Sequence, residues 1–170
     1  MTLANYVTLS RIVLIPLIIL LLLFSLNGLA AMFFLLLSFS DAIDGYIARR
    51  FHQVSDLGKF LDPLADKVLV ITVLIALVGL GKAHSVPVMI IVVRELIVQG
   101  IRIDAAKHKK IIAAAPIAKW KTVIQIVAVA MLILSLPFAN WALWLAVVLS
   151  LVSGGSYLWQ SRILKQLKLS

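Results

Sequence analysis

The sequence predicts an all-α protein, an integral membrane bundle of six transmembrane helices with both termini in the cytoplasm. Hydrophobic residues make up 63% of the 170-residue chain, and the mean hydropathy of +1.11 is far above that of a soluble domain. Long apolar runs recur along the whole sequence, and about 20 helical residues cross a bilayer core of ~30 Å. We therefore expect residues 1–170 to form a single membrane domain. The chain contains no cysteine, which excludes thiol catalysis, disulfides and cysteine-ligated metals.

The predicted helices follow from the apolar runs and from the turn signals between them. A first span starts near Leu9, after a short N-terminal interfacial helix segment. The apolar run from Ile12 to Ser40 is too long for one crossing, and the turn signal SLNG at 25–28 divides it. The later spans are expected at 29–48, 58–80, 86–103, 121–136 and 141–159. A cleavable signal peptide is the alternative for the first run, but no clear cleavage site follows it.

The basic residues predict the orientation of the bundle. With a cytoplasmic N-terminus, nearly all Lys and Arg residues fall on the cytoplasmic side, Arg94 lies within the fourth span, and only Lys82 falls outside. This bias is the positive-inside pattern. It predicts a multi-pass protein of the cell (inner or plasma) membrane with a site that faces the cytoplasm. The net charge of +9 fits this topology and attraction to anionic lipids, and no soluble basic face for nucleic acid is present.

Five of the seven acidic residues lie between positions 41 and 66, and four of these five recur at helical spacings. Asp41 and Asp44 are three residues apart at the end of the second predicted span, and Asp62 and Asp66 are four apart at the start of the third. Residues at these spacings share a helix face, and the short polar connection makes the two helices antiparallel neighbours. A carboxylate in hydrocarbon costs at least about 2.5–3.5 kcal/mol, so cations must hold this group. Oxygen-only ligands favour Mg²⁺ or Mn²⁺, and four carboxylates suggest two ions, an arrangement used in phosphoryl transfer.

Small residues accompany the carboxylates on the same two faces. Gly45, Ala48 and Gly58 leave room beside the metals for a substrate, and Arg49 can bind a phosphate one turn further on. Close helix packing is the alternative role for the small residues. For Arg49 the alternative is that it marks the cytoplasmic edge of the helix.

These residues together match a known signature. The pattern is Asp41-x-x-Asp44-Gly45-x-x-Ala48-Arg49, eight residues, and Gly58-x-x-x-Asp62-x-x-x-Asp66. Every fixed position resembles the signature of the CDP-alcohol phosphotransferases. The segments NYVTLSR, LGKFLDPLADK, RELIVQGIR and AKWKT are most similar to the phosphatidylglycerophosphate synthase branch of that family, from which Ala118 departs because glycine is expected there.

The resemblance implies an enzyme that transfers the phosphatidyl group of CDP-diacylglycerol to an alcohol and releases CMP. It implies that two Mg²⁺ or Mn²⁺ ions are held by Asp41, Asp44, Asp62 and Asp66. Asp66 is the expected general base, because it lies deepest along the second carboxylate face, where the acceptor can approach. The expected contacts of the CDP-lipid are Asn5, Thr8, Gly45, Ala48, Arg49 and Gly58.

The acceptor implied by this branch is sn-glycerol 3-phosphate, whose phosphate requires cationic residues. Arg94 is the first candidate, because an arginine within a span faces a partner or a polar cavity. Glu95 points about 100° away around the helix, so we do not expect the two to pair. The further candidates are Arg102, Lys119, Lys121 and Arg11, with plain topological charge as the alternative for each. Asn5, Thr8 and Arg11 recur every three residues and are expected to contact nucleotide or phosphate, with helix capping as the alternative for Asn5.

Three other functions are compatible with parts of the pattern. The same family with another acceptor, such as inositol phosphate, differs in only a few cationic residues. A divalent-cation transporter would place its carboxylates near mid-membrane and show an inverted repeat, and neither is seen. A polyprenyl-type transferase would carry tightly spaced Asp-rich motifs on widely separated helices. The expected partners are CDP-diacylglycerol, sn-glycerol 3-phosphate and the lipid bilayer, with no nucleic acid, and a homodimer is left open.

Overall fold

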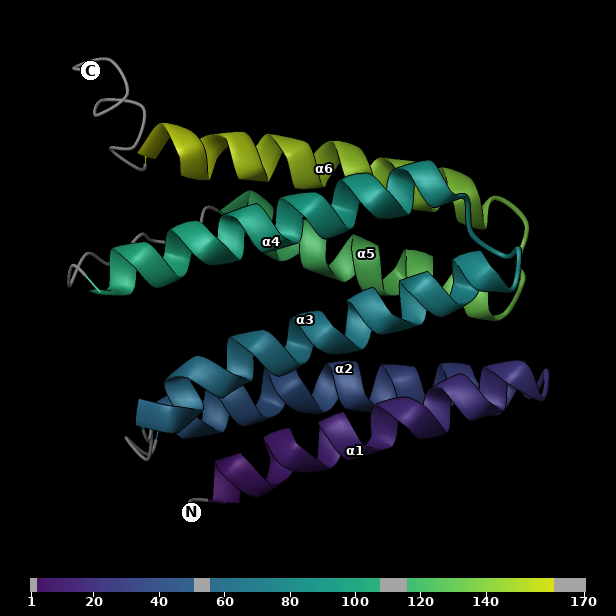
Figure 1. The fold of residues 1–170 in the computed structure, drawn as a ribbon, viewed down its shortest axis with the longest axis horizontal. Coiled ribbons are helices and arrows are strands. Elements are labelled where there is room, and N and C mark those ends of the chain that lie inside the picture. Colours follow the sequence, from purple (N-terminus) through teal and green to yellow (C-terminus); the bar gives the residue numbers. More distant parts are fainter. Residues whose placement is uncertain (1–2, 51–55, 108–115, 161–170) are drawn as a thin grey trace. The chain divides into compact units, whose positions relative to one another are not determined.

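The computed structural model is helical throughout the part of the chain that it describes. The backbone is described for residues 3–50, 56–107 and 116–160, and the side chains for 13–40, 67–101 and 120–155. Six helices lie in these ranges, as Figure 1 shows: α1 (Leu3–Leu23), α2 (Asn27–Arg50), α3 (Asp56–Gly79), α4 (Ser85–Lys107), α5 (Pro116–Ile133) and α6 (Ala139–Gln160). The predicted all-α class and the predicted number of helices are confirmed for the described residues.

The helix boundaries differ from the predicted ones mainly in α1 and α5. Helix α1 is continuous from Leu3 to Leu23, so the predicted interfacial segment and the first span are one helix. Helix α5 runs from Pro116 to Ile133 rather than over 121–136. Proline suits the first turn of a helix because its φ is already helical and its missing N–H is not needed there. The apolar run on which the prediction rested starts later than this proline.

Three of the helices end in the same way. After α1, α3 and α5, a backbone N–H reaches five residues back, from Leu26 to Leu21 O, from Lys82 to Leu77 O and from Leu136 to Met131 O, each at 2.9 Å. This is the Schellman arrangement, which requires one residue of positive φ. Gly81 supplies it after α3, with a φ of 69°. Ser25 and Ser135 supply it after α1 and α5, with φ values of 58° and 54°. The chain turns where the sequence predicted, but the turn ends earlier than the predicted range of 25–28, because α2 already begins at Asn27.

The chain divides into two compact units. The first comprises residues 1–83 and 129–139, and the second comprises 84–128 and 140–170. In the first unit α1 packs against both α2 and α3, and α2 also contacts α3, as the three neighbouring ribbons in Figure 1 show. The fully buried side chains of this unit include Ile18, Leu22, Phe34, Val73, Leu74 and Leu77. Those of the second unit include Ile91, Ala128, Leu143 and Ala146.

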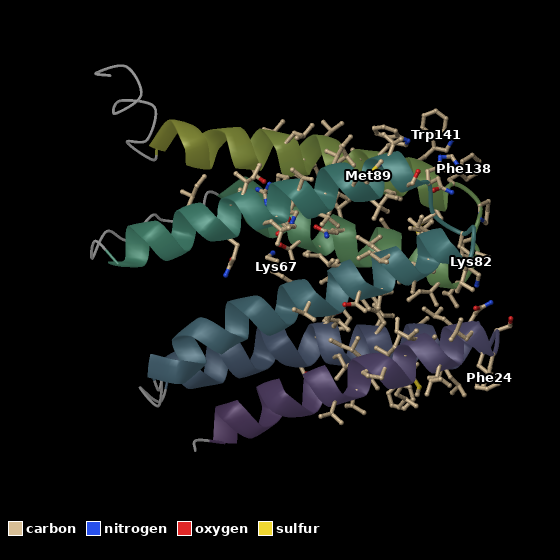
Figure 2. All side chains as sticks on the ribbon, in the orientation of Figure 1. Phe24, Lys67, Lys82, Met89, Phe138 and Trp141 are labelled. Carbon is tan, nitrogen blue, oxygen red and sulfur yellow. The ribbon has the colours of Figure 1, made fainter. Side chains whose placement is uncertain are left out.

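Large apolar side chains also remain exposed along the helices and in the turns between them. Figure 2 shows Phe24, Met89, Phe138 and Trp141 at such positions, and all four are more than half exposed. Among the described residues, none of the helices reaches the length and apolarity that crossing a membrane demands. The predicted six-span membrane bundle and its orientation are therefore not confirmed by the structure.

Lys82 connects three segments of the first unit. Its Nζ donates to the side-chain oxygen of Asn27 at 2.6 Å and to the carbonyl oxygen of Ile133 at 3.2 Å. Asn27 begins α2 and Ile133 ends α5, while Lys82 follows α3 and is labelled in Figure 2. One ammonium group thus joins the start of α2 to the ends of α3 and α5.

We expect Lys82→Met to lower the free energy of unfolding by about 1.5–3 kcal/mol, because hydrogen bonds to charged groups contribute roughly this much. Denaturant unfolding of the purified protein measures the change. Asn27→Ala should be destabilising as well, and the double variant should lose less than the sum of the two single losses, since both remove the same contact. Strictly additive losses would show that the contact contributes nothing to stability.

Candidate functional site

The four predicted metal ligands lie on the pair formed by α2 and α3. Asp41 and Asp44 lie within the last three turns of α2, and Asp62 and Asp66 within the first three turns of α3. The two helices contact each other, and only residues 51–55 separate the end of one from the start of the other. Because both aspartate pairs lie beside this connection, the backbone brings them to the same end of the helix pair. These backbone positions agree with the prediction that each aspartate pair shares one face of its helix. Four carboxylate groups provide oxygen donors of the kind that Mg²⁺ or Mn²⁺ prefers.

The side chains of these aspartates fall outside the part of the structure in which side chains are described. The same holds for the other candidates on α1, α2, α3, the end of α4 and the start of α5, which are Asn5, Thr8, Arg11, Gly45, Ala48, Arg49, Gly58, Arg102 and Lys119. Within the described residues, no group of three or more His, Asp or Glu side chains could hold a metal ion. The metal site therefore stays a prediction, supported by helix register and donor chemistry.

A second charged group is buried in the second unit, where it joins α4, α5 and α6. Glu95 on α4 is only 3% exposed and accepts hydrogen bonds from Arg94 Nη1 at 3.0 Å and from Lys121 Nζ. Lys121 on α5 is equally buried. We call these three residues the Arg94–Glu95–Lys121 cluster.

Helix α6 completes the surroundings of Arg94. The Nε of Arg94 donates to the carbonyl oxygen of Ser150 at 2.8 Å, and its Nη2 donates to Ser153 Oγ at 2.5 Å. The Ser153 hydroxyl also donates to the Ser150 carbonyl at 3.1 Å. The guanidinium is therefore fixed by the carboxylate of its neighbour on α4 and by two oxygens of α6.

The expectation that Arg94 and Glu95 do not pair is wrong. A rotation of about 100° separates their side-chain directions, but their Cα atoms are only about 3.8 Å apart. The long arginine side chain can bend its charged end across this distance. Burial of Glu95 also favours contact with both available cations, because an unpaired buried charge is costly. The expected role of Arg94 in binding the acceptor phosphate stays a prediction.

Four residues that contact Arg94 or lie directly against it were not among the predicted site residues: Glu95, Ser150, Ser153 and Gly154. Glu95 is the only glutamate in the sequence, and a single glutamate within an apolar run is a sequence feature that could have indicated a buried charged group. The other three follow the spacing of one helix face, but small residues in an apolar helix equally indicate close packing. Only the structure shows that Arg94 lies against them.

Comparison with known proteins gives a consistent result. A sequence model described as CDP-alcohol phosphatidyltransferase matches residues 1–152. A Bacillus subtilis protein named CDP-diacylglycerol–glycerol-3-phosphate 3-phosphatidyltransferase is 40% identical, with 91% of this chain and 92% of that protein covered. Proteins of the same name from Rickettsia bellii and Rickettsia typhi are each 38% identical, with 91% of this chain covered and 92% and 94% of the relatives. These matches span the α2–α3 carboxylates and the greater part of the chain that follows them.

We expect Glu95→Ala to destabilise the protein by about 3–5 kcal/mol, because it leaves the buried Lys121 ammonium without its carboxylate. Thermal unfolding measures this loss. Glu95→Gln combined with Lys121→Met removes both buried charges, and this double variant should be more stable than Glu95→Ala. If the double variant were the less stable of the two, the contact between Glu95 and Lys121 would not determine the loss.

Proposed function

The chain belongs to the CDP-alcohol phosphatidyltransferase family, and from this premise we propose that it is a phosphatidylglycerophosphate synthase. It transfers the phosphatidyl group of CDP-diacylglycerol to sn-glycerol 3-phosphate and releases CMP. The observation that carries this proposal is the near full-length similarity to relatives that bear the corresponding name. The complete aspartate signature on α2 and α3 supports it.

The metal site of the proposed enzyme is formed by Asp41, Asp44, Asp62 and Asp66, which hold two divalent cations, Mg²⁺ or Mn²⁺. Their placement at the joined ends of α2 and α3 supports this assignment. Bound divalent cations neutralise the diphosphate of the donor and the charge that develops on departing CMP.

The remaining residues of the proposed site bind and orient the two substrates. Gly45, Ala48 and Gly58 leave room for the head group of CDP-diacylglycerol, while Arg49, Asn5 and Thr8 contact its phosphates or nucleoside. Asp66 accepts the proton of the acceptor hydroxyl. The hydroxyl oxygen then forms a bond to the lipid-side phosphorus, and the bond from that phosphorus to the CMP oxygen breaks.

The phosphate of glycerol 3-phosphate requires a cationic site. The candidates are Arg94, Arg102, Lys119, Lys121 and Arg11. Arginine is well suited to this role, since its planar group can bind two phosphate oxygens at once. Arg94 and Lys121 are the two whose side chains are described, and both belong to the buried cluster.

We also propose that the chain lies in the cell membrane, with the carboxylates facing the cytoplasm. The many exposed apolar side chains support this location, because they would otherwise face water; they include Val13, Leu20, Leu36, Ile75, Leu96 and Val148, each more than half exposed. The positive-inside pattern supports the orientation. Lys82, predicted to lie outside, follows the end of α3 opposite to Asp62 and Asp66. A homodimer is not required by this proposal.

The reaction itself is the first test. Purified protein supplied with CDP-diacylglycerol and labelled glycerol 3-phosphate should move the label into lipid and release one CMP per transfer. EDTA should abolish the transfer, and Mg²⁺ or Mn²⁺ should restore it, because four carboxylates cannot bind a diphosphate unaided. Full turnover in chelator would contradict the metal site. Transfer to another alcohol but not to glycerol 3-phosphate would contradict the acceptor and leave the family assignment intact.

Single replacements test the aspartate assignments. Asp41→Asn, Asp44→Asn, Asp62→Asn and Asp66→Asn should each lower kcat by on the order of 100-fold or more, since even groups that only orient a metal ligand contribute 10- to 100-fold. Asp56→Asn is the matched control, because it is the same exchange at a residue of α3 outside the shared face. Equal losses in the control and the four variants would show that the assignment of helix faces is wrong.

A further inference from the structure

The Arg94 guanidinium is held in place yet keeps donors available. Arginine has five N–H donors, and three of them bind the Ser150 carbonyl, the Ser153 hydroxyl and the Glu95 carboxylate. The remaining two, one on each terminal nitrogen, have no partner among the described residues. The side chain is 11% exposed. Two N–H groups on the two terminal nitrogens are the arrangement that binds two oxygens of a phosphate.

Gly154 allows this position of Arg94. A Cβ built at Gly154 would lie 2.9 Å from Arg94 Nε and 3.4 Å from its Cγ. The first distance is shorter than real side chains tolerate, so the arginine would have to move. The neighbouring Gly155 has open space around an added Cβ. The absence of a side chain at Gly154, and not at Gly155, is therefore what permits the close approach of Arg94 to α6.

The two cations that bind Glu95, Lys121 and Arg94, differ in how exposed their side chains are. The side chain of Lys121 is only 4% exposed, and its ammonium binds Glu95. Of the two cations that bind Glu95, Arg94 is the more exposed. In addition, the hydroxyl of Ser150 is buried and has no hydrogen-bond partner among the described residues. Buried hydroxyls are rarely left unpaired, and this one belongs to the residue whose carbonyl oxygen binds Arg94 Nε.

We propose that Glu95, Ser153 and Gly154 are positioning residues that fix Arg94 as the phosphate-binding group for a phosphomonoester acceptor. Lys121 serves as the counter-ion of Glu95 and does not itself bind the phosphate. This inference rests on the proposed function, because the acceptor proposed there carries a phosphomonoester. It deepens that function by selecting Arg94 from the five cationic candidates.

Gly154→Ala tests the proposal, because it displaces the guanidinium without removing a charge. We expect KM for glycerol 3-phosphate to rise roughly tenfold or more, since a misplacement of about 1 Å can have effects of this size. KM for CDP-diacylglycerol should stay within about twofold. Gly155→Ala is the matched control, because both variants exchange glycine for alanine within α6. It should leave both KM values unchanged, because an added Cβ at Gly155 has open space around it.

The effect of Gly154→Ala should also depend on Arg94. In an Arg94→Lys background, KM for glycerol 3-phosphate is already raised, and Gly154→Ala should add little to it, because the guanidinium that the new methyl would displace is gone. An added rise as large as in the wild-type background would overturn the proposal. So would a rise in KM for CDP-diacylglycerol alone, which would assign Arg94 to the donor, or unchanged kinetics in Gly154→Ala.

A binding measurement separates this inference from the proposed function. Glycerol 3-phosphate, added without CDP-diacylglycerol, should raise the Tm of the wild-type protein and of Gly155→Ala but not that of Gly154→Ala. An equal rise in all three proteins would overturn the role of Gly154. A selective rise together with no transfer to glycerol 3-phosphate would contradict the proposed function and preserve the phosphate site.

Discussion

The pairing of buried charge is the constraint on which the rest of this structure depends. The chain is 63% hydrophobic, and removing an ion from water costs several kcal/mol unless a partner compensates. In the second unit Glu95 meets this constraint by binding both Arg94 and Lys121. Because the three residues and their serine partners come from α4, α5 and α6, the same contacts fix the register of these helices. One carboxylate thus connects α4 to α5 directly and to α6 through Arg94.

The aspartates of α2 and α3 pose the same problem on a larger scale. Four carboxylates gathered at one end of a helix pair repel one another. In our proposal the compensating charge comes from divalent cations and leads directly to function, since a diphosphate can share the same ions. The two charged groups would then have separate tasks. We propose the reacting diphosphate as the ligand of the aspartates and the acceptor phosphate as the ligand of Arg94.

The sequence predicted most of the helices because they follow long apolar runs, and it predicted the family because the aspartate spacing is specific. It misplaced the start of α5, where Pro116 begins the helix before the apolar run. It failed on Arg94 and Glu95 because their contact depends on side-chain torsions and on the positions of α5 and α6, which helix periodicity does not determine. Ser153 and Gly154 look like packing residues until Arg94 is seen against them. The membrane spans and the orientation of the aspartate side chains remain predictions from sequence.

The number of bound metal ions tests the central claim most directly. Electron paramagnetic resonance of purified protein titrated with Mn²⁺, in the presence of CDP-diacylglycerol, counts the ions held per chain. The account predicts two ions per chain, with loss of binding when Asp44→Asn and Asp62→Asn remove one ligand from each helix. Fewer than two ions, or two ions that remain bound in that double variant, would contradict it.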